Sequence, residues 1–333
     1  MSPTTSSNKQ IQIGLVGYGN IGRGVELAIE QNPDMALVGI FTRRNPDDLG
    51  KTAQARLLRI SELEKYLERI DVVLLCGGSA TDLPEQGPHY AGLFNTVDSF
   101  DTHAKIPDYF AAMDRAARKA GKTSVISTGW DPGLFSMMRA LSMSFLPLGK
   151  TYTFWGTGVS QGHSNAVRTI KGVRNAVQYT IPIKDSLKRV RAGLNPDLST
   201  REMHRRVCYV VTEEGADREK IRNEIVTMPN YFAPYDTEVI FISEKKFTSQ
   251  YSRMPHGGFV LRSGLTGENN KELMEFTLQL DSNPEFTGNI MVAYSRAVYR
   301  LNREGQIGAK TVFDIAPSYL STWPKNELLK QLL

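Results

Sequence analysis

The feature that most constrains the fold is an apolar segment near the amino terminus that runs directly into a glycine-rich turn. The segment is Ile11-Gln12-Ile13-Gly14-Leu15-Val16, and the turn is Gly17-Tyr18-Gly19-Asn20-Ile21-Gly22. In a G-x-G-x-x-G turn, the first glycine permits the tight turn, the second lets the backbone approach a phosphate, and the third lets helix and strand pack closely. We therefore predict a strand–turn–helix unit whose helix N-terminus holds the pyrophosphate of a dinucleotide.

The residues after this turn narrow the choice of dinucleotide. A second apolar stretch, residues 36–41, follows at βαβ spacing, and Thr42-Arg43-Arg44 comes directly after it. An NAD site carries an acidic residue about twenty residues after the glycines, for the ribose 2′-hydroxyl, whereas arginine suits a 2′-phosphate. We therefore predict NADP as the cofactor. The alternative is a solvated basic loop beside a structural glycine turn.

Length and composition exclude several classes of protein. A chain of 333 residues, 41% hydrophobic and 23% charged, is typical of a globular protein with two domains. Its net charge of +5 is dispersed and no apolar run reaches membrane-spanning length, so neither nucleic acid nor membrane is an expected partner. Cys76 and Cys208 form no C-x-x-C pair and the histidines lack H-x-x-x-H spacing, which favours a cytoplasmic protein without a metal site. Residues 1–9 are polar and are expected to be a flexible tail, not a signal peptide.

The amino-terminal part alternates strands and helices. Strands are expected at residues 71–76, 93–97 and 124–127, and helices at 61–68 (capped by Ser61 with Glu64), 84–91 and 107–120 (closed by Gly121). This alternation is typical of a Rossmann-type, doubly wound parallel sheet of the α/β class, with ligands at the carboxyl ends of its strands. We assign the NADP-binding domain to residues 10–131 and expect residues 284–333 to pack back on it.

From about residue 152 the pattern changes to strands with alternating faces. They are expected around residues 152–155, 176–180, 206–211, 237–241 and 258–261, with helices at 184–191 and 217–227. A long helix from 283 to about 303 is expected to pack across the two domains. The sequence therefore predicts an α+β second domain with a large mixed sheet at residues 132–283.

Two carboxylates, Asp101 and Asp131, follow predicted strands and should face the nicotinamide end of the cofactor. Carboxylates there suit a substrate with an ammonium group, because a buried cation needs a partner. Asp131 precedes Pro132, so it could instead cap a helix that begins at this proline. The residues alone leave both interpretations open.

Further polar residues lie in the second half. Trp155 precedes Ser160-Gln161-Gly162-His163-Ser164, which is typical of a turn and could also line a pocket. Thr180, Arg206 and His256 lie on or beside predicted strands and would make a carboxylate clamp if they converge. Taken singly, each of these residue types is more often an ordinary residue of a sheet surface.

Several stretches together resemble one family, the NADP-dependent meso-diaminopimelate dehydrogenases of bacterial lysine synthesis. The resemblance spans nearly the whole chain: Val16-Gly17-Tyr18-Gly19-Asn20, Gly39-Ile40-Phe41-Thr42-Arg43-Arg44, Gly78-Ser79-Ala80-Thr81-Asp82, Ser127-Thr128-Gly129-Trp130-Asp131-Pro132-Gly133, Phe154-Trp155-Gly156, Ser160-Gln161-Gly162-His163-Ser164, Ala176-Val177-Gln178-Tyr179-Thr180, Met254-Pro255-His256-Gly257-Gly258, Leu280-Asp281 and Asn283-Pro284. The Ser-Thr-Gly-Trp-Asp-Pro-Gly and Ser-Gln-Gly-His-Ser stretches are specific, whereas the glycine turn occurs in many families.

The resemblance implies oxidative deamination of meso-2,6-diaminopimelate at its D-centre, giving L-2-amino-6-oxopimelate, ammonium and NADPH. It also implies a homodimer, with residues 132–283 as the substrate-binding and dimerisation domain. It implies that Asp101 and Asp131 are catalytic and hold the D-centre amino group. The substrate pocket would also contain Trp130, Trp155, Gln161 and Gly162, and the distal L-end would be held by Thr180, Arg206, His256 and an asparagine, Asn270 or its neighbour Asn269. The cofactor would contact Gly17, Tyr18, Gly19, Asn20, Ile21, Thr42, Arg43, Arg44, Cys76, Gly77, Gly78, Ser79, Ser99, Phe100, Thr128, Gly129, Trp130, Asp131 and Pro132.

Two alternatives remain on sequence grounds. Another two-domain NADP oxidoreductase, such as a dihydrodipicolinate reductase or a sugar dehydrogenase, would need a histidine-rich basic stretch or a lysine and histidine on one helix, and neither pattern is found. A non-catalytic NADP-binding sensor would keep the glycine turn and the arginines. It would have no reason to keep Asp131, Gln161, Thr180, Arg206 and His256 together.

Overall fold

The chain folds into two compact units, which are described here one at a time from a computed structural model covering residues 10–49 and 55–333. Unit 1 comprises residues up to Met137 and from Pro284 onward, and unit 2 comprises Met138–Asn283. The polar segment 1–9, expected to be a flexible tail, lies outside the described residues. Within the described ranges, no helix is both long and apolar enough to cross a membrane.

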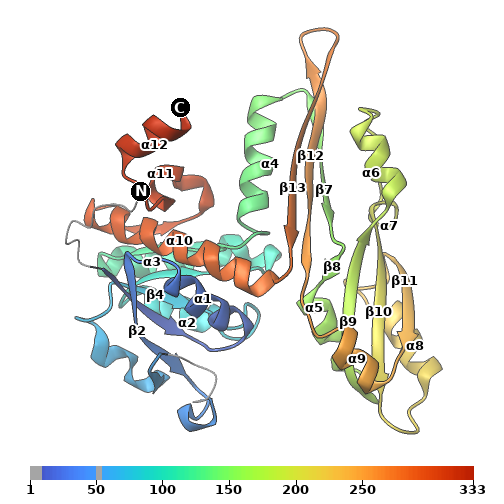
Figure 1. Ribbon diagram of the computed structural model, residues 1–333, viewed down its shortest axis with the longest axis horizontal. Helices are drawn as coiled ribbons and strands as arrows, with labels where there is room; N and C mark the ends of the chain where they lie inside the picture. Colours follow the sequence, from blue (N-terminus) through green and yellow to red (C-terminus); the bar gives the residue numbers. More distant parts are fainter. Residues whose placement is uncertain (1–9, 50–54) are drawn as a thin grey trace. The chain divides into compact units, whose positions relative to one another are not determined.

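Unit 1 is built on a seven-stranded sheet of order β14-β6-β5-β4-β1-β2-β3, in which every neighbouring pair is parallel (Figure 1). The strands are β1 (Ile11–Val16), β2 (Met35–Thr42), β3 (Leu57–Arg59), β4 (Val72–Leu75), β5 (Asn95–Asp98), β6 (Thr123–Val125) and β14 (Gly308–Lys310). The α-helices are α1 (Asn20–Glu30), α2 (Leu83–Ala91), α3 (Ile106–Ala120), α10 (Asn283–Arg303), α11 (Pro317–Leu320) and α12 (Lys325–Leu332). Short 3-10 helices lie at Pro46–Asp48, Ile60–Tyr66, His103–Lys105 and Val312–Asp314. This is the predicted doubly wound parallel sheet.

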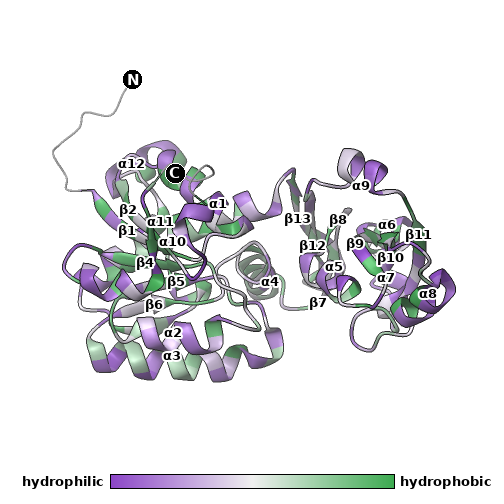
Figure 2. Ribbon diagram, turned by 90° about the horizontal axis from the view of Figure 1, so that it is seen from below, coloured by the Kyte–Doolittle hydropathy of each residue, from purple (hydrophilic) through white to green (hydrophobic). Residues whose placement is uncertain are grey.

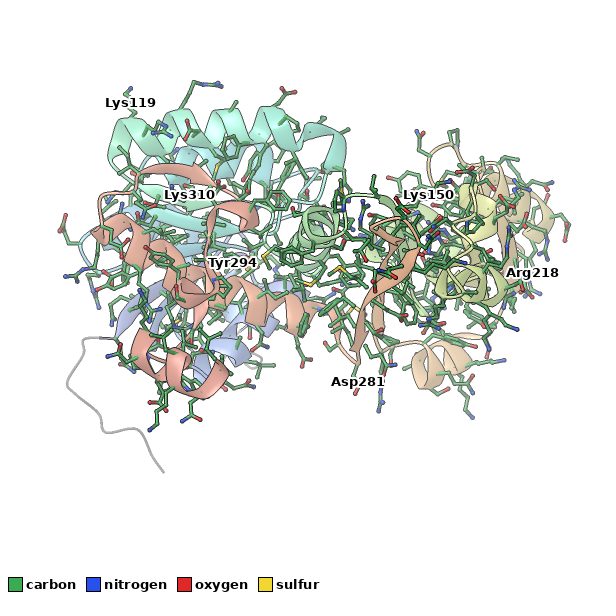
Figure 3. The ribbon with its side chains drawn as sticks, turned by 90° about the horizontal axis from the view of Figure 1, so that it is seen from above. Lys119, Lys150, Arg218, Asp281, Tyr294 and Lys310 are labelled. Carbon is green, nitrogen blue, oxygen red and sulfur yellow. The ribbon has the colours of Figure 1, made fainter. Side chains whose placement is uncertain are left out.

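Each face of this sheet carries its own apolar core, because a parallel sheet buries both faces under helices. One core joins β1 residues such as Ile13 and Leu15 to α1 and α10, and the other joins Val73 and Leu75 of β4 to α2 and α3. Figure 2 shows α1 and α10 on one side of the strands and α2 and α3 on the other. Tyr294, labelled in Figure 3, is a buried member of the α1–α10 core.

Helices α1 and α10 approach each other at a pair of glycines. A Cβ on Gly288 would lie 2.5 Å from the carbonyl carbon of Gly24, and one on Gly24 would lie 2.6 Å from the carbonyl oxygen of Pro284. Neither position therefore tolerates a side chain without moving a backbone. The sequence motif predicts the glycine turn but not this contact, which joins segments far apart in the chain.

Most predicted elements of unit 1 are confirmed, and the bounds of several differ from the predicted ones. The helix expected at 61–68 is a 3-10 helix of residues Ile60–Tyr66, and its N-cap is Arg59, not Ser61. The side chain that accepts a hydrogen bond from the Arg59 N–H (3.2 Å) is that of Glu62, not Glu64. The strand expected at 93–97 begins at Asn95 and ends at Asp98. The strand expected at 124–127 is β6, which ends at Val125, so Ser127 belongs to the loop. Gly121 closes α3 in the left-handed conformation, as predicted (φ 65°).

Unit 2 divides its strands between two sheets, so the one large sheet that we expected is in fact two smaller ones. A four-stranded mixed sheet has the order β11-β10-β9-β8, and a three-stranded antiparallel sheet has the order β13-β12-β7. The strands are β7 (Gly149–Trp155), β8 (Gly158–Val159), β9 (Val173–Pro182), β10 (His204–Thr212), β11 (Asp236–Phe241), β12 (His256–Thr266) and β13 (Asn270–Leu280). The helices are α5 (Gln161–Arg168), α6 (Lys184–Arg191), α7 (Thr200–Met203), α8 (Arg218–Val226) and α9 (Glu244–Gln250), and α4 (Leu134–Phe145) contains the unit boundary.

Strands β12 and β13 form a hairpin and are the longest strands of unit 2 (Figure 1). Its register runs from the His256–Leu280 pair to the Thr266–Asn270 pair at the turn. Lys150, on β7, pairs with Ser263 near the turn, whereas Asp281 follows β13 at the opposite end; both are labelled in Figure 3. Residues near the hairpin turn and residues near Asp281 therefore lie at opposite ends of this sheet.

Candidate active site

The glycine turn of unit 1 leaves the start of α1 open to an anion. Gly17 adopts a φ of 90°, and a Cβ on Gly22 would lie 2.3 Å from the Gly17 carbonyl oxygen, so packing explains these two glycines. A Cβ on Gly19 would meet no atom within 4 Å, so close approach of a ligand explains this one. Gly19 is also the N-cap of α1 and offers no side chain to its N–H groups. These features fit a pyrophosphate.

Of the two arginines after β2, Arg44 contacts this turn and Arg43 contacts Asp82. Arg44 donates a hydrogen bond to the Tyr18 carbonyl oxygen, and its own N–H bonds to the Thr42 hydroxyl (3.1 Å). Arg43 is exposed and forms an ion pair with Asp82 (2.6 Å), which also accepts a hydrogen bond from the N–H of Gly78 (2.9 Å). Arg44 is thus placed beside the glycine turn and Arg43 beside the loop after β4, and an arginine suits a 2′-phosphate.

The loop after β4 contains four of the predicted cofactor residues. Burial raises the pKa of the Cys76 thiol, so this sulfur stays neutral and contributes shape, not charge. Gly77 and Gly78 follow. The hydroxyl of Ser79 accepts hydrogen bonds from the N–H groups of Asp101 (2.9 Å) and Thr102 (3.1 Å). Ser79 therefore ties the β4 loop to the β5 loop.

The loops after β5 and β6 hold the two candidate catalytic carboxylates. Asp101 is exposed and Asp131 is half-buried. Trp130 is buried, with its ring edge-on to Phe135 at 5.2 Å, and its carbonyl oxygen accepts a hydrogen bond from the Phe135 N–H (2.8 Å). Helix α4 begins at Leu134, so Pro132 is not the first residue of a helix, and the interpretation of Asp131 as a cap for such a helix is wrong.

Several predicted cofactor residues in these loops use their side chains internally. The Phe100 ring stacks on Tyr109 with centroids 4.0 Å apart, and the Thr128 hydroxyl donates to the Asp98 carbonyl oxygen (2.8 Å). Their backbone N–H groups also donate to Asp98, so both residues are held in place by this aspartate. Gly129 accepts a hydrogen bond from the Leu134 N–H (2.9 Å), and Ser99 is half-buried.

In unit 2, the centre of the candidate site is a buried arginine. Arg206 lies opposite Thr180 in the β9–β10 pair, with 5% and 2% of their surfaces exposed, and its guanidinium donates a hydrogen bond to the Thr180 hydroxyl. Its Nε has no hydrogen-bond partner. Burial lowers its pKa, and the phenol of Tyr235 partly offsets the effect. Arg206 has no ion pair with a carboxylate among those of the described residues. Such a charge needs an anion from outside the fold.

Neighbouring residues converge on this arginine. Burial, and the charges of Arg206 and His256, lower the pKa of His163 to about 3, so both of these residues lie within electrostatic reach of His163. His163 is neutral and bonds through Nδ1 to the Ser160 hydroxyl (2.7 Å). Gln161, beside Gly162 at the start of α5, donates to the Met254 sulfur (3.5 Å). The predicted group of Gln161, Gly162, Thr180, Arg206 and His256 is thus brought to one region of unit 2.

Trp155 is held by a residue that the sequence analysis did not single out. Its backbone N–H donates to His204 Nε2 (2.8 Å), and the two rings stack with centroids 5.3 Å apart. Burial, and the charge of Arg206, lower the pKa of His204 to about 4, so its Nε2 can accept this bond. Trp155, His204 and Tyr235 line one cavity of about 580 Å³. Single-sequence reasoning had no signal for His204, because its partner lies far away in the chain.

The structure separates Asn270 from this group. Asn270 pairs with Thr266 at the turn of the hairpin, ten pairs from His256, or roughly 30 Å at the rise of a β-strand. Asn269 lies in the turn itself. The asparagine beside the group is Asn283, whose N–H donates to the carbonyl oxygen of Met254 (3.0 Å), two residues before His256. Asn283 belongs to the Asn283-Pro284 motif that the chain shares with the family it resembles, and this motif is the sequence signal that points to it.

Comparison with known proteins finds relatives that match nearly the whole chain. Residues 129–282 match the diaminopimelic acid dehydrogenase C-terminal domain family. The meso-diaminopimelate D-dehydrogenase of Lysinibacillus sphaericus is 61% identical over 323 residues, covering 97% of this chain and 99% of that protein. The structure of Corynebacterium glutamicum DAP dehydrogenase in complex with DAP is 44% identical, with a TM-score of 0.93, covering 98% of this chain and 100% of that one. An engineered D-amino acid dehydrogenase bound to NADP⁺ is 42% identical, with a TM-score of 0.88 and the same coverage.

Proposed function

This chain belongs to the meso-diaminopimelate D-dehydrogenase family, and from that premise we infer the reaction it catalyses. The reaction is the reversible, NADP-dependent oxidative deamination of meso-2,6-diaminopimelate at its D-centre. The substrate, NADP⁺ and water give L-2-amino-6-oxopimelate, ammonium, NADPH and a proton. The observation in this chain that carries the proposal is Arg206, a buried guanidinium whose Nε has no partner.

A diaminopimelate molecule carries an amino acid group at each end, and this chain offers two matching sets of side chains. We assign the carboxylate of the L-end to Arg206 and Thr180, because a guanidinium and a hydroxyl are donors that a carboxylate accepts. His256 and Asn283 complete this set. Trp155, Gln161 and Gly162 shape the pocket. Holding the distal end fixes which face of the D-carbon is presented for reaction.

The D-end carries the ammonium group that reacts. We assign it to Asp101 and Asp131 of unit 1, with Trp130 beside them, since carboxylates stabilise a cation that leaves water. One of these two carboxylates accepts a proton from the ammonium group or from the attacking water. The half-buried Asp131 suits this role better than the exposed Asp101, because a general base must be held in place.

The residues of unit 1 fit NADP. The open start of α1 suits the pyrophosphate, and Arg43 and Arg44 suit the 2′-phosphate. When bound, NADP⁺ supplies the hydride acceptor. Near the ends of β2 and β4, the cofactor would contact Thr42, Cys76, Gly77, Gly78 and Ser79. Near the ends of β5 and β6, it would contact the backbone of Ser99, Phe100, Thr128, Gly129 and Pro132.

The reduction of NADP⁺ tests the function directly. We expect the purified chain to reduce NADP⁺ with meso-diaminopimelate and to leave the LL-isomer unreacted, because only the meso form has a D-centre. D-Alanine tests the distal clamp, since it has no second end for Arg206 to hold. Binding of NADP⁺ without reduction in the presence of the meso isomer would instead indicate a sensor.

Supporting a homodimer, unit 2 exposes a group of large apolar side chains at one end of the three-stranded sheet. Phe145 is 67% exposed, Leu148 66% and Leu265 38%, and the Leu265 N–H donates to the Leu148 carbonyl oxygen (2.9 Å). We propose that a second copy of this chain covers them. Sedimentation should give a dimer, and Phe145→Glu with Leu148→Glu should give a monomer.

We also propose a cytoplasmic location, where free Cys76 and Cys208 stay reduced.

A further inference from the structure

The two carboxylates assigned to the D-end sit on separate loops, and one buried residue joins these loops. Asp98, the last residue of β5, has no exposed surface. Its Oδ1 accepts hydrogen bonds from the backbone N–H groups of Phe100 (3.0 Å) and Ser127 (3.0 Å). Phe100 precedes Asp101 directly, and Ser127 lies four residues before Asp131. A single oxygen atom therefore ties the Asp101 loop to the Asp131 loop.

The other polar atoms of Asp98 strengthen the same junction. Its carbonyl oxygen accepts from the Thr128 N–H (2.9 Å) and the Thr128 hydroxyl (2.8 Å), and its Oδ2 accepts from the Tyr109 hydroxyl (2.8 Å). Ser127 adopts a φ of 57°, a left-handed conformation that is uncommon for a non-glycine residue. The Asp98 carboxylate accepts the N–H of this residue and so stabilises the turn by which the chain enters the Asp131 loop.

We propose that Asp98 is a positioning residue, which sets the separation and orientation of Asp101 and Asp131 through the backbone of their two loops without touching the substrate. The proposal rests on the assignment of these two carboxylates to the D-end. It explains why a buried strand end carries a carboxylate, whose desolvation is unfavourable, where an apolar residue would pack. An apolar residue cannot accept hydrogen bonds from the N–H groups of two loops, whereas the Asp98 carboxylate accepts both.

Tethering, and not charge, is the property that this role requires. The groups that face the carboxylate are neutral: the Tyr109 phenol of α3 and the Cys76 thiol at the end of β4. Burial raises the pKa of Asp98 to about 6, although the three donors lower it in part. An asparagine has an amide oxygen that can accept both N–H groups and an NH₂ that can donate to the phenol. It should therefore preserve the junction.

The test compares Asp98→Ala, Asp98→Asn and Tyr109→Phe in the assay with meso-diaminopimelate and NADP⁺. We expect kcat of Asp98→Ala to fall at least about tenfold, because displaced reacting groups lose their alignment. Its dissociation constant for NADP⁺, from fluorescence titration, should change less than about threefold, because the glycine turn and arginines are intact. Asp98→Asn should retain kcat within about threefold, since it keeps both loop tethers. Tyr109→Phe is the matched control, which loses the third donor but leaves both loops held.

The outcomes separate this inference from the proposed function. A wild-type chain without activity on the meso isomer contradicts the function itself. An active wild type with an equally active, folded Asp98→Ala variant overturns the positioning role. A melting temperature that falls while kcat per NADP⁺-binding site stays constant indicates a purely structural residue and overturns it too. If Asp98→Ala does not fold, Asp98→Asn decides: loss of kcat in that variant at an unchanged melting temperature overturns the proposal.

Discussion

The guanidinium carbon of Arg206 lies 4.0 Å from the centre of the Tyr235 ring, and this contact covers a charge that the β9–β10 pair buries. An aromatic face stabilises a cation but supplies no hydrogen-bond acceptor for its N–H groups. The Arg206 Nε therefore remains available. A fold that keeps such a charge in place without neutralising it is prepared for an anionic ligand.

Replacing Arg206 should weaken binding of diaminopimelate and leave binding of NADP unchanged. We expect Arg206→Met to raise KM for diaminopimelate by roughly a hundredfold, because a buried charge-assisted contact is worth about 3 kcal/mol. Arg205→Met is the matched control, because Arg205 directly precedes Arg206 and is exposed. It forms an ion pair with Glu238 at 3.5 Å. Steady-state kinetics and a separate NADP⁺ titration measure both affinities. An equal loss for substrate and cofactor in Arg206→Met would contradict the assignment.

The two arginines after β2 should decide the preference for NADP over NAD. In Arg43→Ala with Arg44→Ala, KM for NADP should rise about tenfold or more while KM for NAD stays nearly constant, because only NADP carries the 2′-phosphate. The matched control is Lys65→Ala with Arg69→Ala, which removes the same charge from exposed positions of unit 1. Unchanged NADP kinetics in the first variant would mean that the arginines are surface charge only.

The contact between α1 and α10 should be sensitive to a single methyl group. Gly288→Ala would place its Cβ 2.5 Å from the Gly24 carbonyl carbon, so one helix must shift. We expect a loss of about 1–3 kcal/mol in the free energy of unfolding. Asn289→Ala, at the adjacent exposed position, should be nearly neutral. Thermal or urea unfolding of both variants measures the difference, and equal stability of the two would show that the helices adjust freely.

The raised pKa of Asp98 makes a prediction about stability and pH. A carboxyl group with a pKa of about 6 in the folded protein and about 4 in the unfolded chain stabilises the folded state while it is protonated, and this contribution is lost as the pH rises from about 4 to 6. Asp98→Asn does not titrate. Its stability relative to the wild type should therefore increase by about 2 kcal/mol between pH 4 and pH 7. Urea unfolding at the two pH values measures this, and a constant difference would contradict the raised pKa.

Local pattern was enough for most elements of the seven-stranded sheet of unit 1. The glycine turn, the helix that ends at Gly121 and the arginines after β2 are encoded within short segments, because backbone conformation and helix caps depend on neighbours in the chain. Two predictions were wrong because the sequence offered two candidate residues of the same type, and a contact in the folded chain decided between them. Glu62 and not Glu64 reaches back to the start of the helix at residue 60. The hairpin register moves Asn270 away from His256 and leaves Asn283 near it.

What the sequence by itself determined is the local element, a strand–glycine turn–helix. The arginines predicted for a 2′-phosphate, and the carboxylates and arginine predicted for an amino acid substrate, follow from residue type and position in the sequence. What only the tertiary structure decided is which of these groups are buried, paired or tethered. Arg206 is a candidate anion site because β9, β10 and Tyr235 enclose it without an acceptor for its Nε, and Asp98 matters because two loops from different strands converge on one oxygen. Burial and convergence depend on contacts between distant segments, and no local pattern contains them.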